Sequence, residues 1–325
     1  MKKKSTFIIV GLTALITVLC GSLVYRHQRV LYYHNKGVEF YDKGNYPEAV
    51  YWYRKAAEQE YAQSQCNLGL CYYYGRGVEK DYSMAVEWYR KAAEQENANA
   101  QSCLGDCYYN GHGVTIDYFE ATYWYRKAAV QGNAGAQFNL GLCYEHGKGV
   151  DKDKSIAVEW YRKAAKQGNA DAQNNLGVCY YNGNGVAVDY SQAAYWYSKA
   201  AEQGHVYAQY NLGWHYYNGK GVDENKSKAV EWYSKAAESG LAEAQNTLGL
   251  CYEFGYGIAI DYSKAVYWYR KAAEQGHADA QCSLGACYFD GKGVDKDESM
   301  AIYWYRKSAA QGNRIADSLL YLLGL

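Results

Sequence analysis

Cysteine is the residue type whose number and spacing in this 325-residue chain first suggest chemistry. Six of the ten cysteines recur at one position of a 36-residue repeat: Cys71, Cys107, Cys143, Cys179, Cys251 and Cys287. His215 stands where a seventh would fall. Thiols bind metals, form disulfides or act as nucleophiles, but each role needs a partner at short range. The elements that carry the thiols therefore decide the chemistry.

A zinc site is one such role, and the spacing argues against it. Cys103 and Cys107 lie one helical turn apart and His112 follows in a loop, but a fourth ligand is missing. Neither a Cys-x-x-Cys nor a His-x-x-x-His motif occurs in the chain. We therefore expect no metal and no other cofactor.

The six aligned cysteines are expected to be unpaired. They fall on the buried face of the first helix of each repeat, where Cys packs as a small hydrophobic residue. Neighbouring helices lie about 8 to 10 Å apart, whereas the alpha carbons joined by a disulfide lie within about 7 Å. Packing, rather than redox chemistry, explains this position best.

The repeat itself predicts an all-α fold. In one unit Ala136 and Leu140 share a helical stripe, Gly147 is placed to end that helix, and Asp153 is placed to cap a second helix that contains Trp160. Units of this length form solenoids of stacked helix-turn-helix pairs. The Trp of a Trp-Tyr-[Arg/Ser]-Lys motif marks each unit, at positions 52, 88, 124, 160, 196, 232, 268 and 304.

The loop between the two helices carries a Gly-x-Gly-[Val/Ile] motif in seven units. A phosphate-binding loop would need a third Gly or a Lys-[Ser/Thr] ending and a preceding strand, so we interpret these motifs as turns. The chain has 34 Lys and Arg against 34 Asp and Glu. Because it has no net charge, we expect no binding to nucleic acid.

One composite pattern recurs seven times over residues 61–312: Ala-x-x-x-Leu-Gly-x-x-Tyr, Gly-x-Gly-Val, Asp, Ala-x-x-Trp-Tyr-x-Lys-Ala. It resembles the Sel-one-like repeat, a relative of the tetratricopeptide repeat. Residues 31–60 lack the Gly-x-Gly extension and resemble a plain tetratricopeptide entry unit; residues 313–325 would form a capping helix. The resemblance implies a right-handed superhelix whose first helices line a concave groove. It also implies an adaptor or scaffold that binds a protein or peptide partner there.

The same resemblance leaves two other functions open. A cysteine-rich bacterial branch of the family is associated with penicillin binding or weak β-lactamase activity, which implies a secreted or periplasmic hydrolase acting on β-lactam or cell-wall substrates. The second helices of this chain contain no Cys, however, and no Ser-x-x-Lys acylation motif occurs. We favour a non-enzymatic adaptor over the hydrolase, and a passive structural spacer is the third alternative.

The first thirty residues differ from the repeats. Residues 7–25 are uncharged, follow three lysines and precede Arg26. As a helix they would span roughly 28 Å, close to the ~30 Å core of a bilayer. We expect an uncleaved transmembrane signal anchor within residues 1–30, with the array facing the periplasm or exterior. The alternatives are a cleaved signal peptide, which would make the protein secreted, and a buried soluble helix.

Positions that vary between units identify a candidate binding surface. Tyr207, Tyr210, Trp214 and Tyr217 are spaced by three, four and three residues, so they share one helical face apart from the core stripe. The aromatic residues that extend this surface in other units are Phe138, Tyr181 and Phe254. Because Trp and Tyr dominate binding hot spots, we expect these rings to anchor an extended peptide or protein segment. Packing between neighbouring first helices is the alternative.

The last segment, residues 313–325, is apolar on more than one face through four leucines at 319, 320, 322 and 323. A terminal solenoid helix normally turns a polar face to water. We therefore expect self-association through this helix, and the alternative is that the leucines wrap the last helix pair.

Overall fold

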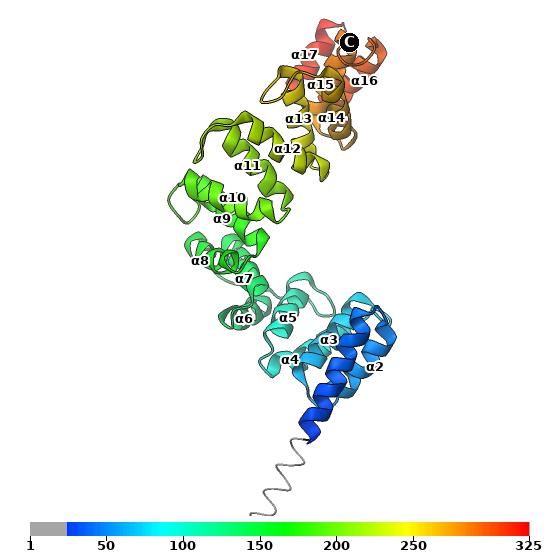
Figure 1. The fold of residues 1–325 in the computed structure, drawn as a ribbon, viewed down its shortest axis with the longest axis vertical. Helices are drawn as coiled ribbons and strands as arrows, with labels where there is room; N and C mark the ends of the chain where they lie inside the picture. The colour runs from blue at the N-terminus through cyan, green and yellow to red at the C-terminus, as the bar shows by residue number, and fades with distance from the viewer. Residues whose placement is uncertain (1–24, 325) are drawn as a thin grey trace, which may run out of the picture. The chain divides into compact units, whose positions relative to one another are not determined.

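The computed structural model describes residues 25–324, and the regular secondary structure in that range is α-helical (Figure 1). The repeating helix pairs form an α-solenoid, as predicted. The chain divides into two compact units, Met1–Asp153 and Lys154–Leu325.

The first unit opens with a helix over residues 25–42. Its further helices are α2 (Tyr46–Ala57), α3 (Ala62–Tyr74), α4 (Tyr82–Glu94), α5 (Ala98–Asn110), α6 (Tyr118–Val130) and α7 (Ala134–His146). The helices of the second unit are α8 (Lys154–Lys166), α9 (Ala170–Asn182), α10 (Tyr190–Glu202), α11 (Val206–Asn218), α12 (Lys226–Glu238), α13 (Ala242–Phe254), α14 (Tyr262–Glu274), α15 (Ala278–Asp290), α16 (Glu298–Ala309) and α17 (Arg314–Leu322).

The Gly-x-Gly loops are turns, as predicted, and they also join successive repeats. The first Gly ends a helix in the left-handed conformation, as Gly219 does after α11 with φ of 62°. The second Gly, such as Gly221, lies so close to the backbone of Tyr190 at the start of α10 that a side chain would not fit. At the same helix end, the carboxylate of Asp189 accepts a hydrogen bond of 2.9 Å from the backbone N–H of Gln192.

The two helices of a pair approach closely because a Gly faces a Tyr. A Cβ added to Gly213 would lie 2.7 Å from ring carbons of Tyr233, so only Gly allows this approach. The six aligned cysteines are buried, as predicted, and no disulfide joins any of the nine cysteines in the described range. Burial raises the pKa of the Cys71 thiol to about 11.

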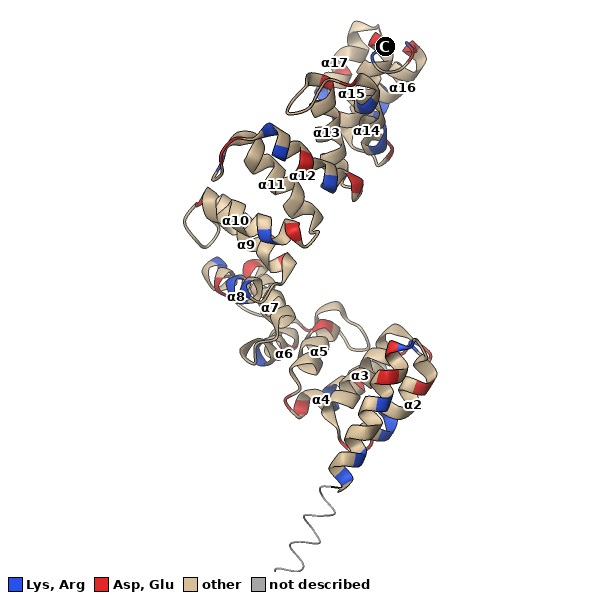
Figure 2. Ribbon diagram, viewed as in Figure 1, with Lys and Arg blue, Asp and Glu red and all other residues tan. Residues whose placement is uncertain are grey.

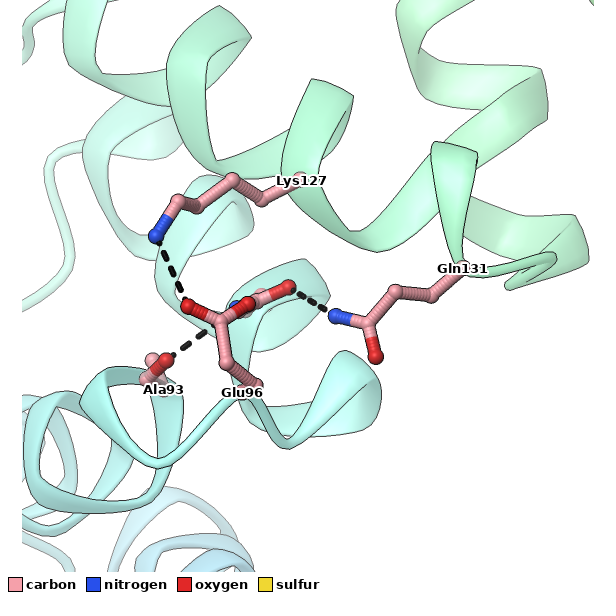
Figure 3. Close-up of polar contacts among 5 residues, drawn as sticks. Ala93, Glu96, Lys127 and Gln131 are labelled. Atoms are coloured by element: carbon pink, nitrogen blue, oxygen red, sulfur yellow. Dashed lines mark hydrogen bonds and ion pairs between the residues drawn. The ribbon is translucent and has the colours of Figure 1, made fainter.

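A ladder of glutamines links successive repeats (Figure 3). The Gln101 amide donates to the carbonyl of Ala93 at 3.1 Å, and the Gln131 amide donates to Oε1 of Gln101 at 2.8 Å. Beside this step Lys127 and Glu96 form an ion pair of 3.1 Å. The same amide-to-amide bond joins Gln65 and Gln95, Gln173 and Gln203, Gln245 and Gln275, and Gln281 and Gln311.

The predicted single-pass membrane localisation, with the array facing the periplasm or exterior, is corrected by the structure. In the part of the chain that the structure describes, every helix is too short or too polar to cross a bilayer. The helix over residues 25–42 is interrupted by charges, among them Arg29, Lys36 and Glu39. Residues 7–24 of the predicted anchor lie outside the described residues, and we withdraw the prediction of a membrane protein.

The predicted capping segment contains α17. Its Ala316 and Leu320 pack against the core beside Tyr305, whereas the side chains of Tyr321 and Leu322 are exposed. Only some of the four leucines therefore pack against the last helix pair. Self-association through the exposed residues stays a prediction.

Candidate functional site

Helix α11 carries four of the predicted binding residues and no Lys, Arg, Asp or Glu along its length (Figure 2). The ring of His205 caps its first turn, with Nδ1 accepting a hydrogen bond of 3.2 Å from the N–H of Ala208. Ala208 and Leu212 are buried in the core stripe, so the aromatic residues project from other sides of the helix.

Two hollows, each of about 260 Å³, flank α11. The first lies between α9, α10 and α11 and is lined by Val178, Tyr181, Asn182, Tyr197, Tyr210, Asn211, Trp214 and His215. The second lies between α11, α12 and α13 and is lined by Tyr210, Trp214, Tyr217, Asn218, Tyr233, Thr247, Leu250, Cys251 and Tyr256. Tyr210 and Trp214 line both hollows and form the wall between them.

The two hollows occupy the same position in successive repeats. A shift of 36 residues converts every lining residue of the first hollow except Tyr210 into a lining residue of the second. The corresponding pairs are Val178 and Trp214, Tyr181 and Tyr217, Asn182 and Asn218, Tyr197 and Tyr233, Asn211 and Thr247, Trp214 and Leu250, and His215 and Cys251. The two hollows are therefore equivalent in position, although several of their paired side chains differ in chemistry.

Ring contacts hold the walls in place. Tyr181 of α9 meets Trp214 edge to face, with ring centroids 5.2 Å apart and an interplanar angle of 86°. Tyr210 lies 5.5 Å from Tyr233 of α12. These side chains are half-buried, except Tyr233, which is buried. Each half-buried ring is therefore partly covered by a neighbouring ring and partly open to solvent.

Three of the predicted binding residues, Tyr207, Phe254 and Phe138, line neither hollow. Tyr207 is 61% exposed, lines neither hollow and has its ring 6.3 Å from that of His205. Phe254 is 52% exposed and stacks at 5.7 Å on Tyr256, a wall residue of the second hollow. Phe138 is half-buried on α7 in the first unit and belongs to neither hollow.

His215, which the sequence pattern showed only as a substituted cysteine, forms part of the first hollow. Its ring is 1% exposed, and Nδ1 donates a hydrogen bond of 2.6 Å to the carbonyl of Lys220. Nε2 has no donor within the described residues. Burial lowers the pKa of the imidazole, so the ring is neutral and Nε2 is an acceptor.

The hollows are neutral but not wholly apolar. No charged side chain appears among their lining residues. Besides Nε2 of His215, the polar groups of the walls without a hydrogen-bond partner in the described chain include the indole N–H of Trp214 and the carboxamides of Asn182 and Asn211. Residues 25–324 also contain no cluster of three His, Cys, Asp or Glu side chains that could hold a metal ion. The arrangement is therefore suited to binding through rings and hydrogen-bond donors.

A model of the Sel1 repeat family matches eight consecutive segments of the chain. They are residues 32–61, 62–97, 98–133, 134–169, 170–205, 206–241, 242–277 and 278–313. The chain belongs to the Sel1 repeat family. The first matched segment covers most of the entry unit, in which residues 43–45 alone separate the two helices. Sel1 repeat proteins are generally protein-interaction scaffolds and typically non-enzymatic.

Two solved Sel1 repeat structures are similar over nearly all of this chain. The c5321 protein of uropathogenic Escherichia coli, described as a protective antigen with an SLR fold, is 40% identical with a TM-score of 0.84; the match covers 90% of this chain and 64% of c5321. A Sel1 repeat protein from Oxalobacter formigenes is 33% identical with a TM-score of 0.67, and the match covers 91% and 90% of the two chains. The chain thus spans 64% of c5321. None of the curated proteins compared with it matches.

Proposed function

We propose that this Sel1 repeat protein is an adaptor that captures an extended segment of a partner protein across α11. The observation that carries the proposal is the wall formed by Tyr210 and Trp214 between two equivalent hollows. The core of α11 is supplied separately by Ala208 and Leu212, so fold stability alone does not require Trp at position 214.

The energetics favour a binding role for these rings. Tyr and Trp offer large contact areas and have few rotatable bonds, so fixing them costs little conformational entropy. The contacts of Trp214 with Tyr181, and of Tyr210 with Tyr233, reduce that cost further. Truncating an aromatic residue at a binding hot spot costs about 2 kcal/mol or more of binding free energy.

The repeats themselves supply a substitution that separates binding from stability. Leu occupies the position of Trp214 in three other units, at Leu70, Leu142 and Leu250. A Trp214→Leu variant therefore removes the indole but keeps a side chain that this fold accepts. The matched control is Tyr195→Glu on α10, because Tyr195 is an exposed ring outside both hollows and Glu159 fills the same position in another unit.

A random peptide-display selection on the full chain tests the proposal without assuming a partner. We expect enriched peptides that bind the wild type and the Tyr195→Glu variant but lose affinity for Trp214→Leu. If every enriched peptide binds Trp214→Leu as well as the wild type, α11 is not the capture surface.

The chemistry of the second hollow favours the adaptor over the hydrolase. Cys251 is its one thiol, and burial raises the pKa of that thiol to about 11, the opposite of what a nucleophile needs. In the first hollow, the ring of His215 is buried against Tyr181 and Trp214. We expect no hydrolysis of nitrocefin by the purified chain, whereas turnover that follows the protein through purification would favour the hydrolase.

The passive spacer makes a different prediction. A spacer would give no peptide whose affinity depends on Trp214, and the display selection separates it from the adaptor.

A further inference from the structure

We infer that the captured segment is basic: its arginine side chains contact the rings of the two hollows, and the carboxylates of Asp171, Glu243 and Glu253 on α9 and α13 attract its positive charge. This inference rests on the proposed function, because it assumes that a segment of a partner protein binds across α11. It specifies the charge of that segment and the residue type that contacts the rings.

Positive and negative charges lie on different helices of the second unit (Figure 2). Every second helix, namely α8, α10, α12, α14 and α16, carries at least one Lys or Arg. The first helices α9, α11, α13 and α15 contain no Lys or Arg, and their charged residues are Asp171, Glu243, Glu253, Asp279 and Asp290. The chain as a whole has no net charge, so this difference comes from where the charges lie. A segment that binds along the first helices therefore meets carboxylates and no cation of those helices.

Three of these carboxylates lie on first helices that line the hollows together with α11. Helix α9 lines the first hollow and carries Asp171, and α13 lines the second hollow and carries Glu243 and Glu253. The carboxylate of Asp171 lies 3.4 Å from Nε2 of His205, the residue that caps α11. Asp171 and Glu243 stand one repeat before and one repeat after Tyr207. Acidic side chains are therefore present in the repeats on both sides of α11.

Helix stability does not account for Glu253. This residue lies in the last turn of α13, where the helix macrodipole disfavours a carboxylate. A shift of 36 residues relates it to Tyr217, which lines the second hollow. Its carboxylate accepts a hydrogen bond of 2.6 Å from the hydroxyl of Tyr269, which the same shift relates to Tyr233 of the second hollow. The row of positions that is aromatic at Tyr217 is thus acidic one repeat further along.

Cations of the chain do not neutralise the three carboxylates. Within residues 25–324, none of the three forms an ion pair with a Lys or Arg. The charge of Lys292 acts on Glu253 from a longer distance, but the ion pair of Lys292, of 3.2 Å, is with Asp290. A basic segment supplies the positive charge that these carboxylates lack.

The rings suit arginine in particular. Tyr and Trp faces attract a cation within about 6 Å of the ring centroid, and the flat, weakly hydrated guanidinium stacks on such rings. Tyr217 of the second hollow already has such a contact, because Nζ of Lys226 lies 5.6 Å from its ring centroid. Lys226 is itself paired with Glu224 at 3.5 Å. The unpaired carboxamides of Asn182 and Asn211 add oxygens that accept hydrogen bonds from guanidinium N–H groups.

A form of the full chain without these three charges tests the inference. It combines Asp171→Asn, Glu243→Gln and Glu253→Gln, and we call it the first-helix variant. Other repeats carry Asn99 and Gln63 at the first two positions, so the fold accepts these side chains. Gln at position 253 keeps an oxygen that accepts the hydrogen bond from the Tyr hydroxyl.

The matched control removes the same number of negative charges from second helices. It combines Glu202→Gln, Glu238→Gln and Glu274→Gln, at the last residues of α10, α12 and α14. Both variants have the same net charge, so a difference between them reports where the charges lie. Thermal melts followed by circular dichroism confirm that both are folded before binding is compared.

The probes are the peptides that the display selection enriches and that lose affinity for Trp214→Leu. Relative to the unselected library, we expect these peptides to carry a net positive charge and more Arg than Lys. Fluorescence anisotropy at about 50 mM salt should show about tenfold weaker binding to the first-helix variant than to the control. At about 500 mM salt the two variants should bind nearly equally, because salt screens charges at the rim of a binding site.

Two results would overturn the inference and leave the adaptor standing: Trp214-dependent peptides that are neutral or acidic, or equal binding of the two variants at low salt. An equal loss of affinity in both variants would assign the effect to the net charge of the chain and would also overturn it. If no selected peptide depends on Trp214, the adaptor site itself is wrong, and the inference fails with it.

Discussion

Replacing Ser239 by Gln should restore a missing step of the glutamine ladder and stabilise the second unit. At equivalent steps a Gln donates to the Oε1 of a Gln thirty residues earlier, as Gln203 does to Gln173 at 2.7 Å. Ser239 is too short to do so, and Oε1 of Gln209 is buried with no donor among the described residues. The Ser239 hydroxyl donates instead to the carbonyl of Lys235.

The magnitude follows from two opposing contributions. A buried acceptor without a partner costs about 1 to 3 kcal/mol of folding free energy. Ordering a Gln side chain costs up to about 2 kcal/mol of conformational entropy. For Ser239→Gln we expect a net gain of about 1 kcal/mol. The reverse change in the neighbouring repeat, Gln203→Ser, leaves Oε1 of Gln173 unpaired and should cost about 1 to 3 kcal/mol.

Urea denaturation of the full chain, followed by circular dichroism, measures both variants. Ser239→Ala is the control, because it removes the hydroxyl without adding a donor and should change stability little. The midpoint should rise for Ser239→Gln and fall for Gln203→Ser. If the urea midpoint of Ser239→Gln is no higher than that of the Ser239→Ala control, the unpaired Gln209 oxygen does not destabilise the fold by the assigned amount. An unchanged midpoint for Gln203→Ser would refute the ladder as a source of stability.

Three further predictions concern the helix pairs and their buried groups. Gly213→Ala should destabilise the fold by about 1 to 3 kcal/mol, because the new Cβ overlaps the ring of Tyr233. Urea denaturation measures this loss, and an unchanged midpoint would show that the ring can move away. The pKa of His215 is below 6.5 in the folded chain, so the unfolded chain takes up the proton first as pH falls. The stability of the wild type should therefore decrease below about pH 6.5, and that of His215→Cys should decrease less. Thermal melts between about pH 7 and pH 5 measure this difference, and an equal loss of stability in the two proteins would contradict the prediction. With a thiol pKa of about 11, Cys71 should react with a disulfide reagent at about pH 8 only after denaturant is added, and rapid labelling of the native chain at this residue would contradict its burial.

The helix pairs and their ends could be predicted from the sequence because they depend on local rules. The left-handed Gly after each first helix and capping residues such as Asp189 involve residues a few positions apart, and the 36-residue period repeats these local signals along the chain. Burial of the aligned cysteines followed from helical spacing in the same way. The membrane prediction depended on hydropathy and length, and the charged helix over residues 25–42 gave it no support.

The hollows could not be predicted, because they form between helices. Helical spacing indicates the direction of a side chain but not what covers it, so Tyr207 and Trp214 looked equivalent although only Trp214 lines a hollow. Tyr256 lies within a Gly-x-Gly motif that was interpreted only as a turn, so it was not predicted to be a binding residue. Its ring lies 6.0 Å from that of Tyr217 at the second hollow. The ladder pairs residues thirty positions apart, which becomes visible only when successive repeats are stacked.

The affinity of a display-selected peptide for three forms of the full chain tests the central claim most directly. The forms are the wild type, the Tyr210→Asn/Trp214→Leu double variant and the Tyr195→Glu control. Asn and Leu are the residues of neighbouring repeats at these positions, so we expect melting temperatures close to that of the wild type. Loss of about 2 kcal/mol of binding free energy would weaken binding about thirtyfold in the double variant, with no change in the control. Equal Kd values for all three forms, measured on folded proteins, would contradict the claim that the wall between the two hollows binds the partner.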